Sequence, residues 1–159
     1  QLFRESLEIR CNTLGPNHHE VASSLRHIGR IYQDRGEHEQ ALRLHTKALS
    51  ILQSCPRDCS EDLIEVLMGL GQAQHSTGCH EQALRSYEAA ATLLRHNQQK
   101  GKKVSPEHIA RVLNIMGNLA LDMSNVDAAS AYFAEAASLS ENSPATVEIK
   151  DLPVCAAAA

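Results

Sequence analysis

Four side chains of this sequence have the types that bind zinc, and they come in two groups. Cys55 and Cys59 are separated by three residues, one of which is Pro56, and Cys79 with His80 follows 20 residues after Cys59. Thiolate sulfur and imidazole nitrogen are ligands that zinc prefers, but structural zinc sites use closely spaced ligand pairs. The spacing therefore favours structural thiols over a metal site.

The sequence carries no recognised catalytic motif. It has no phosphate-binding P-loop, no G-x-S-x-G nucleophile elbow and no H-E-x-x-H zinc helix. The GLG at residues 69–71 lacks the third glycine of a dinucleotide-binding fingerprint. The nine histidines, His45 among them, follow the repeating pattern described below, so we interpret them as packed parts of a scaffold. We therefore expect a protein that is not an enzyme and holds no cofactor or metal.

A line of polar side chains is the remaining candidate site. Arg26, Arg30 and Gln33 are spaced i, i+4 and i+7, so they share one face of a predicted helix, away from its apolar stripe. Arg, Gln, Asn and Met suit contact with a peptide, although a solvated face without a binding role is the alternative. The predicted line consists of Ser23, Arg26, Arg30, Gln33, Glu65, Met68, Gln72, His75, Arg111, Asn114, Asn118 and Leu121.

Two amphipathic helices joined by a glycine turn form the unit that positions this line. Leu25, Ile28 and Tyr32 lie on one face of the first predicted helix, and a second apolar set that includes Ala41 follows Gly36. The apolar faces of the two helices must pack against each other and against neighbouring units. An all-α fold built from antiparallel helix pairs is therefore predicted.

The unit repeats along the chain. Gly29 recurs 42 residues later as Gly71 and 46 residues after that as Gly117, and Ala41 recurs with the same two steps. The periodicity predicts a solenoid over residues 1–142 and a tail over residues 143–159. Within the solenoid we expect the second helix of a truncated repeat at residues 1–14 and three whole repeats at 17–53, 59–96 and 105–140.

The order L-x-x-I-G-x-x-Y, then G, then A-x-x-x-H-x-x-A resembles the tetratricopeptide repeat, whose small residues let two helices approach closely. The long period and the linker TLGPNHHEVASSL look like the kinesin light chain type, which is also found in nephrocystin-like scaffold proteins. The resemblance implies a right-handed superhelix whose first helices line a concave groove that clamps extended peptides. Asn114 matches an asparagine common in kinesin light chain repeats, whereas Arg26, Met68 and Gly69 depart from that pattern.

Local signals predict where the helices begin and end. Asn17 is expected to cap the helix that follows it, with Glu20 completing a capping box. Gly36 is expected to provide the left-handed turn at the end of that helix. Ser105 and Pro106 are expected to begin a later helix as its N-cap and first-turn residue.

Three further segments carry expectations. The third turn has Ser124 and Asn125 where earlier repeats have glycine, and asparagine tolerates the left-handed conformation better than most residues. The basic stretch at residues 95–103 is interpreted as a solvated loop between repeats, with a patch for an acidic surface as the alternative. The segment TVEIKDLPV at residues 146–154 fits an extended strand or a disordered tail, and both remain open.

Composition limits the class of partner. A formal charge of −4 and a pI near 6.1 give no global attraction to nucleic acid or to an anionic membrane. The sequence contains no run of about 18 apolar residues, the length that a bilayer span requires. Its five cysteines are an odd number, which fits a reducing compartment better than a disulfide framework. We expect a cytoplasmic protein, with a cytoskeletal or ciliary location as a variant.

Two functional hypotheses follow. The first is an adaptor that binds a protein or a short peptide, acidic or carboxylate-bearing, in the groove of the first helices. The second is an architectural segment of a large cytoskeletal or ciliary assembly that is held through its ends and its convex face. Neither end of the solenoid carries a polar capping helix, so we expect a fragment of a longer chain or end-to-end association.

Overall fold

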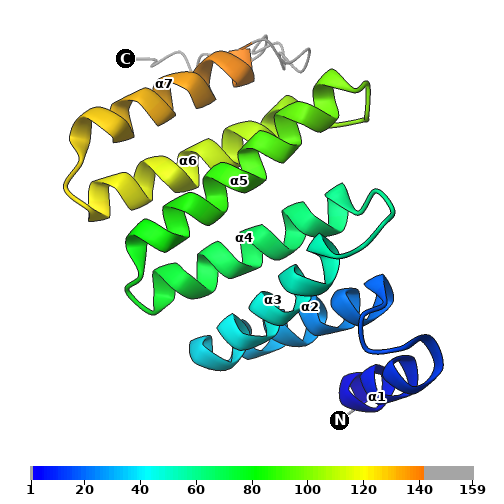
Figure 1. Ribbon diagram of the computed structural model, residues 1–159. Coiled ribbons are helices and arrows are strands. Elements are labelled where there is room, and N and C mark those ends of the chain that lie inside the picture. The colour runs from blue at the N-terminus through cyan, green and yellow to red at the C-terminus, as the bar shows by residue number, and fades with distance from the viewer. Residues whose placement is uncertain (1, 142–159) are drawn as a thin grey trace, which may run out of the picture.

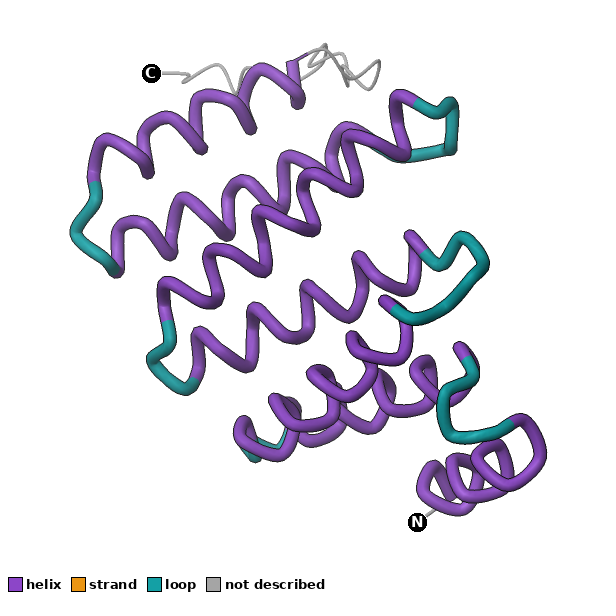
Figure 2. Tube along the Cα trace, in the orientation of Figure 1, coloured by secondary structure: helices purple, strands orange, loops and turns teal. Residues whose placement is uncertain are grey.

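Seven α-helices make up the part of the chain that the computed structural model describes, residues 2–141. No strand occurs within these residues, so the predicted all-α class is confirmed (Figure 2). The predicted tail at residues 143–159 lies outside the described residues. The helices are α1 (Leu2–Leu14), α2 (His19–Asp34), α3 (His38–Gln53), α4 (Ser60–Ser76), α5 (His80–Gln99), α6 (Pro106–Asp122) and α7 (Val126–Glu141).

The helices stack in the order of the sequence, with α1 and α7 at opposite ends (Figure 1). The closest packing joins α2 with α3, α4 with α5, and α6 with α7, and successive pairs meet through α3 with α4 and α5 with α6. The longer connections, after α1, α3 and α5, lie along one edge, and the three short turns lie along the other (Figure 2). The molecule is therefore a solenoid of antiparallel helix pairs.

A glycine on the first helix of each pair faces a ring on the second helix. A Cβ atom placed on any of these glycines would lie within 2.6–2.9 Å of the facing ring, closer than non-bonded side-chain atoms approach each other. The three glycine–ring pairs are Gly29 with His45, Gly71 with Tyr87, and Gly117 with Phe133. The repeat register predicted from the glycines is the one that the helices use.

The short turn within each pair needs one residue with a positive φ. Gly36 (φ 76°) and Gly78 (φ 79°) supply it in the first two pairs, as expected for Gly36. In the third pair Ser124 takes this conformation, with φ 60°. Asn125 instead begins the next helix, because its Oδ1 accepts a hydrogen bond from the backbone N–H of Ala128 at 3.1 Å. The asparagine therefore acts as a cap and not as the left-handed residue.

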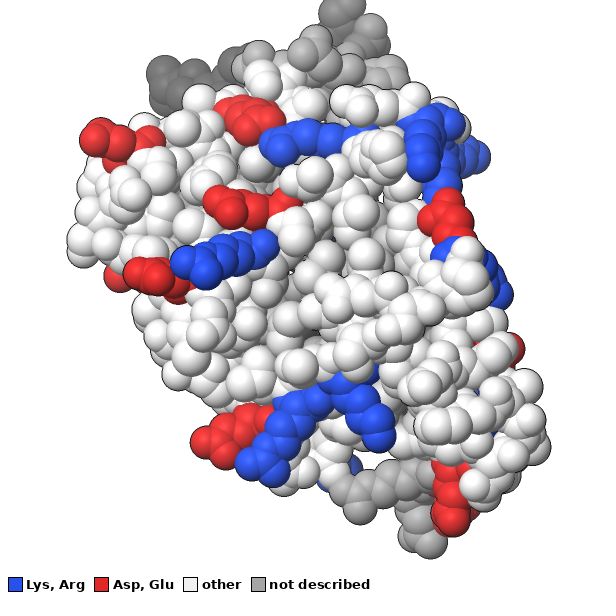
Figure 3. Space-filling view, in the orientation of Figure 1, with Lys and Arg blue, Asp and Glu red and all other residues white. Residues whose placement is uncertain are grey.

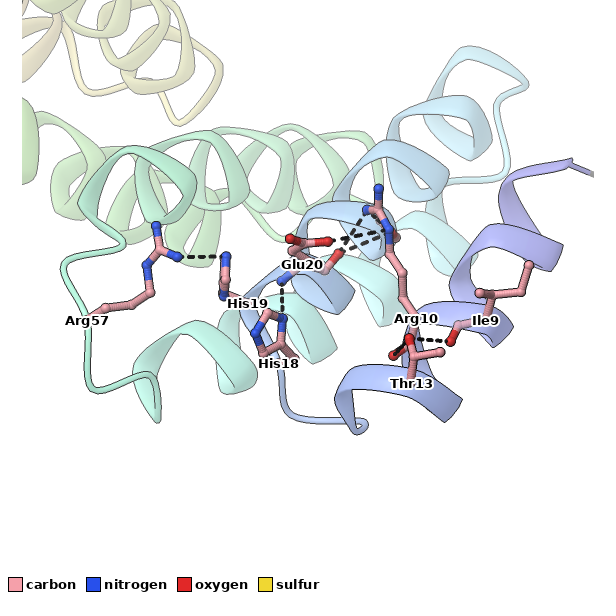
Figure 4. A network of polar contacts seen from close by, with 8 residues as sticks. Ile9, Arg10, Thr13, His18, His19, Glu20 and Arg57 are labelled. Carbon is pink, nitrogen blue, oxygen red and sulfur yellow. Dashed lines mark hydrogen bonds and ion pairs between the residues drawn. The ribbon is translucent and has the colours of Figure 1, made fainter.

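The predicted cap at Asn17 is wrong. The backbone N–H of His18 donates to the carbonyl oxygen of Gly15 at 3.3 Å, and Asn17 lies within the turn that this bond forms. The helix therefore starts one residue later than expected. His18 is the N-cap, and its Nδ1 accepts a hydrogen bond from the backbone N–H of Glu20 at 3.3 Å. The Glu20 carboxylate does not complete a capping box but pairs with Arg10 of α1 at 3.8 Å (Figure 4).

The basic stretch at residues 95–103 is only partly the predicted loop, because α5 continues to Gln99. Its last four residues, with three of its four Lys and Arg side chains, lie in the connection between repeats. Lys102 holds this connection, since its Nζ donates to a carboxylate oxygen of Asp58 at 2.6 Å in the loop after α3. Ser105 is the N-cap of α6, as predicted. Figure 3 shows Lys and Arg side chains gathered at the edge where these connections lie.

Replacing Gly71 with Leu is expected to lower the free energy of unfolding by about 1–3 kcal/mol, because the Tyr87 ring leaves no room for a side chain. Gly36→Ala provides the comparison, since a Cβ at Gly36 would meet no atom within 4 Å and only the positive φ opposes it. This variant should lose about 1 kcal/mol. Urea unfolding measures both, and an unchanged midpoint for Gly71→Leu would contradict the packing described above.

Candidate functional site

A hollow of about 430 Å³ opens on the face to which α2, α4 and α6 contribute. Helices α2 and α4 are in direct contact beneath it, although they belong to different pairs. Six residues of the predicted polar line lie together around this hollow, which we name the first-helix groove. Its lining residues are Arg26, Arg30, Gln33, His45, Glu65, Met68, Gly69, Gln72, Tyr87 and Ile115.

The other half of the predicted line lies outside the hollow. His75 is half-buried, and its Nε2 lies 2.9 Å from a carboxylate oxygen of Asp122 at the end of α6. The side chain of Leu121 is 47% exposed. A binding role for these positions stays a prediction. The predicted residues that do not line the hollow are Ser23, His75, Arg111, Asn114, Asn118 and Leu121.

Four lining residues were not in the predicted line. Gly69 and Ile115 stand 46 residues apart, so they are equivalent positions of successive repeats, one residue after Met68 and its equivalent. Aligning the repeats and including the residue that follows each position of the predicted line would have found them. His45 and Tyr87 come from second helices, where the sequence indicated only packing.

His45 forms the floor of the groove and joins three helices. Its ring is 1% exposed and lies between Gly29 of α2 and Gly69 of α4, where a Cβ on Gly69 would lie 2.5 Å from Cε1 of the ring. Gln33 of α2 donates its amide N–H to the carbonyl oxygen of Gly69 at 2.7 Å. Its amide oxygen therefore accepts from Nε2 of His45, which lies 3.3 Å away.

These contacts change the role predicted for Gln33. The sequence placed it among side chains that face a ligand, whereas the structure buries it and commits both ends of its amide to its neighbours. The same hydrogen bonds place a proton of His45 on Nε2, and Nδ1 is buried without a hydrogen-bond partner in the described structure, so no acceptor there favours a second proton. Gln33 and His45 thus fix the spacing of α2, α3 and α4 and leave ligand contact to other residues.

Burial also determines the charge of the histidines near the groove. Loss of water around His45, together with a smaller effect of the nearby Arg26 guanidinium, lowers its pKa to about 4. The pKa of His27 is lowered as well, by burial first and then by Arg26 and Arg30. Neutral imidazoles at this site add no positive charge at neutral pH.

The arginines of the groove differ in how far they are compensated. Arg26 of α2 lies 3.6 Å from the Glu65 carboxylate of α4, and its side chain is only 18% exposed. Arg30 is exposed and has no ion pair within residues 2–141. The uncompensated positive charge of the groove therefore comes from Arg30.

The two groups of possible zinc ligands lie at opposite ends of α4. Cys55 and Cys59 precede this helix, and Cys79 and His80 follow it. A helix of 17 residues is about 25 Å long at about 1.5 Å per residue, so the two groups cannot share one ion. Across the described part of the chain, no three His, Cys, Asp or Glu side chains gather in a way that could hold a metal.

Membrane insertion has no candidate helix in the described structure. Among residues 2–141, none of the helices combines the length and the apolar character that a bilayer span requires.

Comparison with protein families identifies repeats at both ends of the chain. Two models, each described as a tetratricopeptide repeat, match residues 1–54 and residues 110–143. The first match contains the helices α1, α2 and α3, and the second contains most of the last pair. No curated protein matches the sequence.

Solved structures share the fold. The TPR domain of Arabidopsis FLU has a TM-score of 0.65 at 14% identity, over 77% of this chain and 96% of that one. BtubC (BKLC) from P. vanneervenii has a TM-score of 0.64 at 16% identity, over 86% of this chain and 52% of that one. PcrH, in complex with the chaperone binding region of PopB, has a TM-score of 0.58 at 21% identity, over 79% and 86%. Such identities establish the fold and nothing finer.

His45 makes a pH-dependent contribution to stability that can be isolated. The unfolded ring binds a proton below its ordinary pKa of about 6.5, whereas the folded ring binds one only near 4. The unfolded state thus holds more protons between these values, so the free energy of unfolding should fall as the pH falls through this window. The expected loss from His45 is about 2 kcal/mol between about pH 7 and pH 4.5.

The variant His45→Phe separates this effect from that of the other histidines. Phenylalanine keeps an aromatic ring at this position, as Tyr87 and Phe133 do at the equivalent places of the later pairs, and it does not titrate. Urea unfolding at several pH values should show a steeper loss of stability for the natural chain than for the variant. Parallel curves would mean that His45 is not held neutral in the folded state.

Proposed function

We propose that this chain, which carries tetratricopeptide repeats, is a non-catalytic scaffold that binds a short linear segment of a partner protein in the first-helix groove. Solenoids of this kind use their extended concave surfaces for binding. PcrH, which has a similar fold, is in complex with a region of another protein, PopB. The observation that carries the proposal is the open hollow of about 430 Å³ and its mixed lining.

The lining suits a peptide because it combines apolar and polar residues. Met68, Gly69 and Ile115 offer apolar surface to a side chain of the ligand. Gln72 is exposed at the edge of the hollow and makes no hydrogen bond to another residue within the described part of the chain, so its amide is available to a peptide backbone. A few polar groups around an apolar surface are what orient a ligand in most binding sites.

The charge of the groove favours an acidic or carboxylate-bearing segment. Because Glu65 compensates Arg26, selection for acid depends on Arg30 and not on both arginines. An exposed charge acts over about 8 Å at physiological ionic strength, so binding should weaken as salt is added. Ordering a flexible peptide opposes binding, and the affinity should therefore be modest.

Peptide titration tests the proposal. Acidic peptides of about six residues, which span about 20 Å when extended, should bind more tightly than basic peptides of the same length. Arg30→Glu should weaken binding of the acidic peptide at least about tenfold, because it replaces attraction with repulsion at the same place. Isothermal titration calorimetry at low and physiological salt measures both effects.

Arg85→Glu is the matched control, since Arg85 is exposed on α5 and does not line the groove. It makes the same change in net charge and should leave peptide binding as it is. Equal binding of both peptide classes, unaffected by salt or by Arg30→Glu, would remove the groove as a binding site. The architectural hypothesis would then remain, with contacts through the ends and the convex face.

We further assign the repeats to the long-period type that resembles kinesin light chain. The 42- and 46-residue separations of Gly29, Gly71 and Gly117 support this subtype. A cytoplasmic location, with cytoskeletal or ciliary association, is proposed together with it. Fractionation of cells that express the full-length protein would test the location.

A further inference from the structure

Two thiols lie in contact in the connection between α3 and α4. The Sγ–H of Cys59 donates to the Sγ of Cys55, and the two sulfur atoms are 3.2 Å apart. A disulfide bond is about 2.05 Å long, so the sulfurs need to approach by only about 1 Å to form one. Cys55 follows the C-cap of α3, Ser54, and Cys59 is the N-cap of α4, whose carbonyl oxygen accepts the first hydrogen bond of that helix from the N–H of Leu63 at 2.9 Å, so both side chains lie at the ends of the helices and not within them. The approach therefore requires no helix to unwind.

The folded connection holds the two thiols together. Cys59 packs against the apolar core formed by α2, α3 and α4. The backbone N–H of Cys55 donates to the carbonyl oxygen of Leu52 at 3.2 Å, which fixes the start of the connection to the end of α3. Asp58, next to Cys59, is held by Lys102 from the connection after α5. The pair is thus positioned by the fold.

We propose that Cys55 and Cys59 are a covalent modification site, a dithiol that a low-molecular-weight disulfide such as oxidised glutathione converts to an intramolecular disulfide. The two remaining described cysteines lie elsewhere, Cys11 on α1 and Cys79 at the opposite end of α4. This site shares no lining residue with the first-helix groove and does not depend on the function proposed for it.

The reaction is thiol–disulfide exchange in two steps. The Cys55 thiolate attacks one sulfur of oxidised glutathione, which breaks that disulfide and releases one glutathione thiolate. Cys59 then gives its proton to solvent and attacks the Cys55 sulfur of the mixed disulfide, which releases the second glutathione. Two protein thiols are oxidised and one glutathione disulfide is reduced to two thiols, so atoms and electrons balance.

The environment of Cys59 determines the order of the steps. Burial of its sulfur raises the pKa of the Cys59 thiol to about 11, and its hydrogen bond to Cys55 acts in the same direction. Cys59 therefore stays protonated near neutral pH and is the weaker first nucleophile. Cys55 forms the mixed disulfide, and the adjacent Cys59 resolves it.

The bond would lie within the connection between α3 and α4, which also contacts the start of α2 and the connection after α5. Arg57, between the two cysteines, donates to Nε2 of His19 at 2.8 Å at the start of α2. Asp58 pairs with Lys102 at the other side. Oxidation would thereby fix the connection from which both contacts come.

Mass spectrometry of the full chain tests the proposal. The protein is incubated with excess oxidised glutathione, treated with a maleimide and weighed. The reduced chain has five cysteines and should take up five maleimides, whereas the oxidised chain should lose about 2 Da and keep three cysteines outside the bond, each carrying either a maleimide or one glutathione. Trypsin cleaves after Arg57, between the two cysteines, so the bond should appear as one peptide ending at Arg57 linked to the peptide that begins at Asp58.

Two variants identify the bond, because the second peptide also contains Cys79. In Cys79→Ser the linked peptides should persist. In Cys59→Ser they should disappear, and Cys55 should keep one glutathione as a mixed disulfide. A natural chain that still takes up five maleimides would overturn the proposal, and so would a linkage that is lost in Cys79→Ser. Unchanged circular dichroism of both variants establishes that they fold.

Discussion

The close approach of two helices at a glycine is the contact on which the rest of this structure depends. In each pair a ring from the second helix lies where a larger residue on the first helix would place its side chain. Alanines at further contact positions, such as Ala41 and Ala83, are completely buried and allow the same short separation. The chain can therefore build its core from small residues and few aromatics.

In the first pair this contact also forms the floor of the first-helix groove. The ring there is an imidazole, and it touches glycines of two neighbouring first helices instead of one. The imidazole donates a hydrogen bond to Gln33, and the amide N–H of Gln33 in turn binds the carbonyl oxygen of Gly69 and joins α2 to α4. The rings of Tyr87 and Phe133 each face only a glycine of their own pair. The distance between first helices in the groove is thus set by the same side chain that sets the distance within the pair.

The periodicity of the sequence was sufficient for the fold but not for every residue of the site. Equivalent glycines at fixed steps predicted the helix pairs and their register, because each pair repeats one packing solution. Gln33 was assigned to the ligand-facing side because a count along one helix does not show which residues a neighbouring helix covers. His18 was missed as a cap for a similar reason, since the turn at Gly15 that displaces the helix start is a property of backbone geometry. The positive charge that Arg26 and Arg30 bring to the predicted line is reduced by the contact of Arg26 with Glu65, which lie on different repeats.

Packing between pairs differs from packing within them, and this difference separates the two proposed activities of the chain. Within a pair the helices meet along their length, whereas successive pairs share a smaller contact that polar bonds at one edge supplement. The ion pair of Lys102 with Asp58 and the hydrogen bond of Arg57 with His19 are such contacts, and an exposed ion pair contributes little to stability. Apolar contact between α3 and α4 and between α5 and α6 must therefore hold the pairs in line. The cysteine pair at that edge takes no part in the glycine contacts, and the groove is held from within by His45 and Gln33, so the two proposed activities depend on different residues.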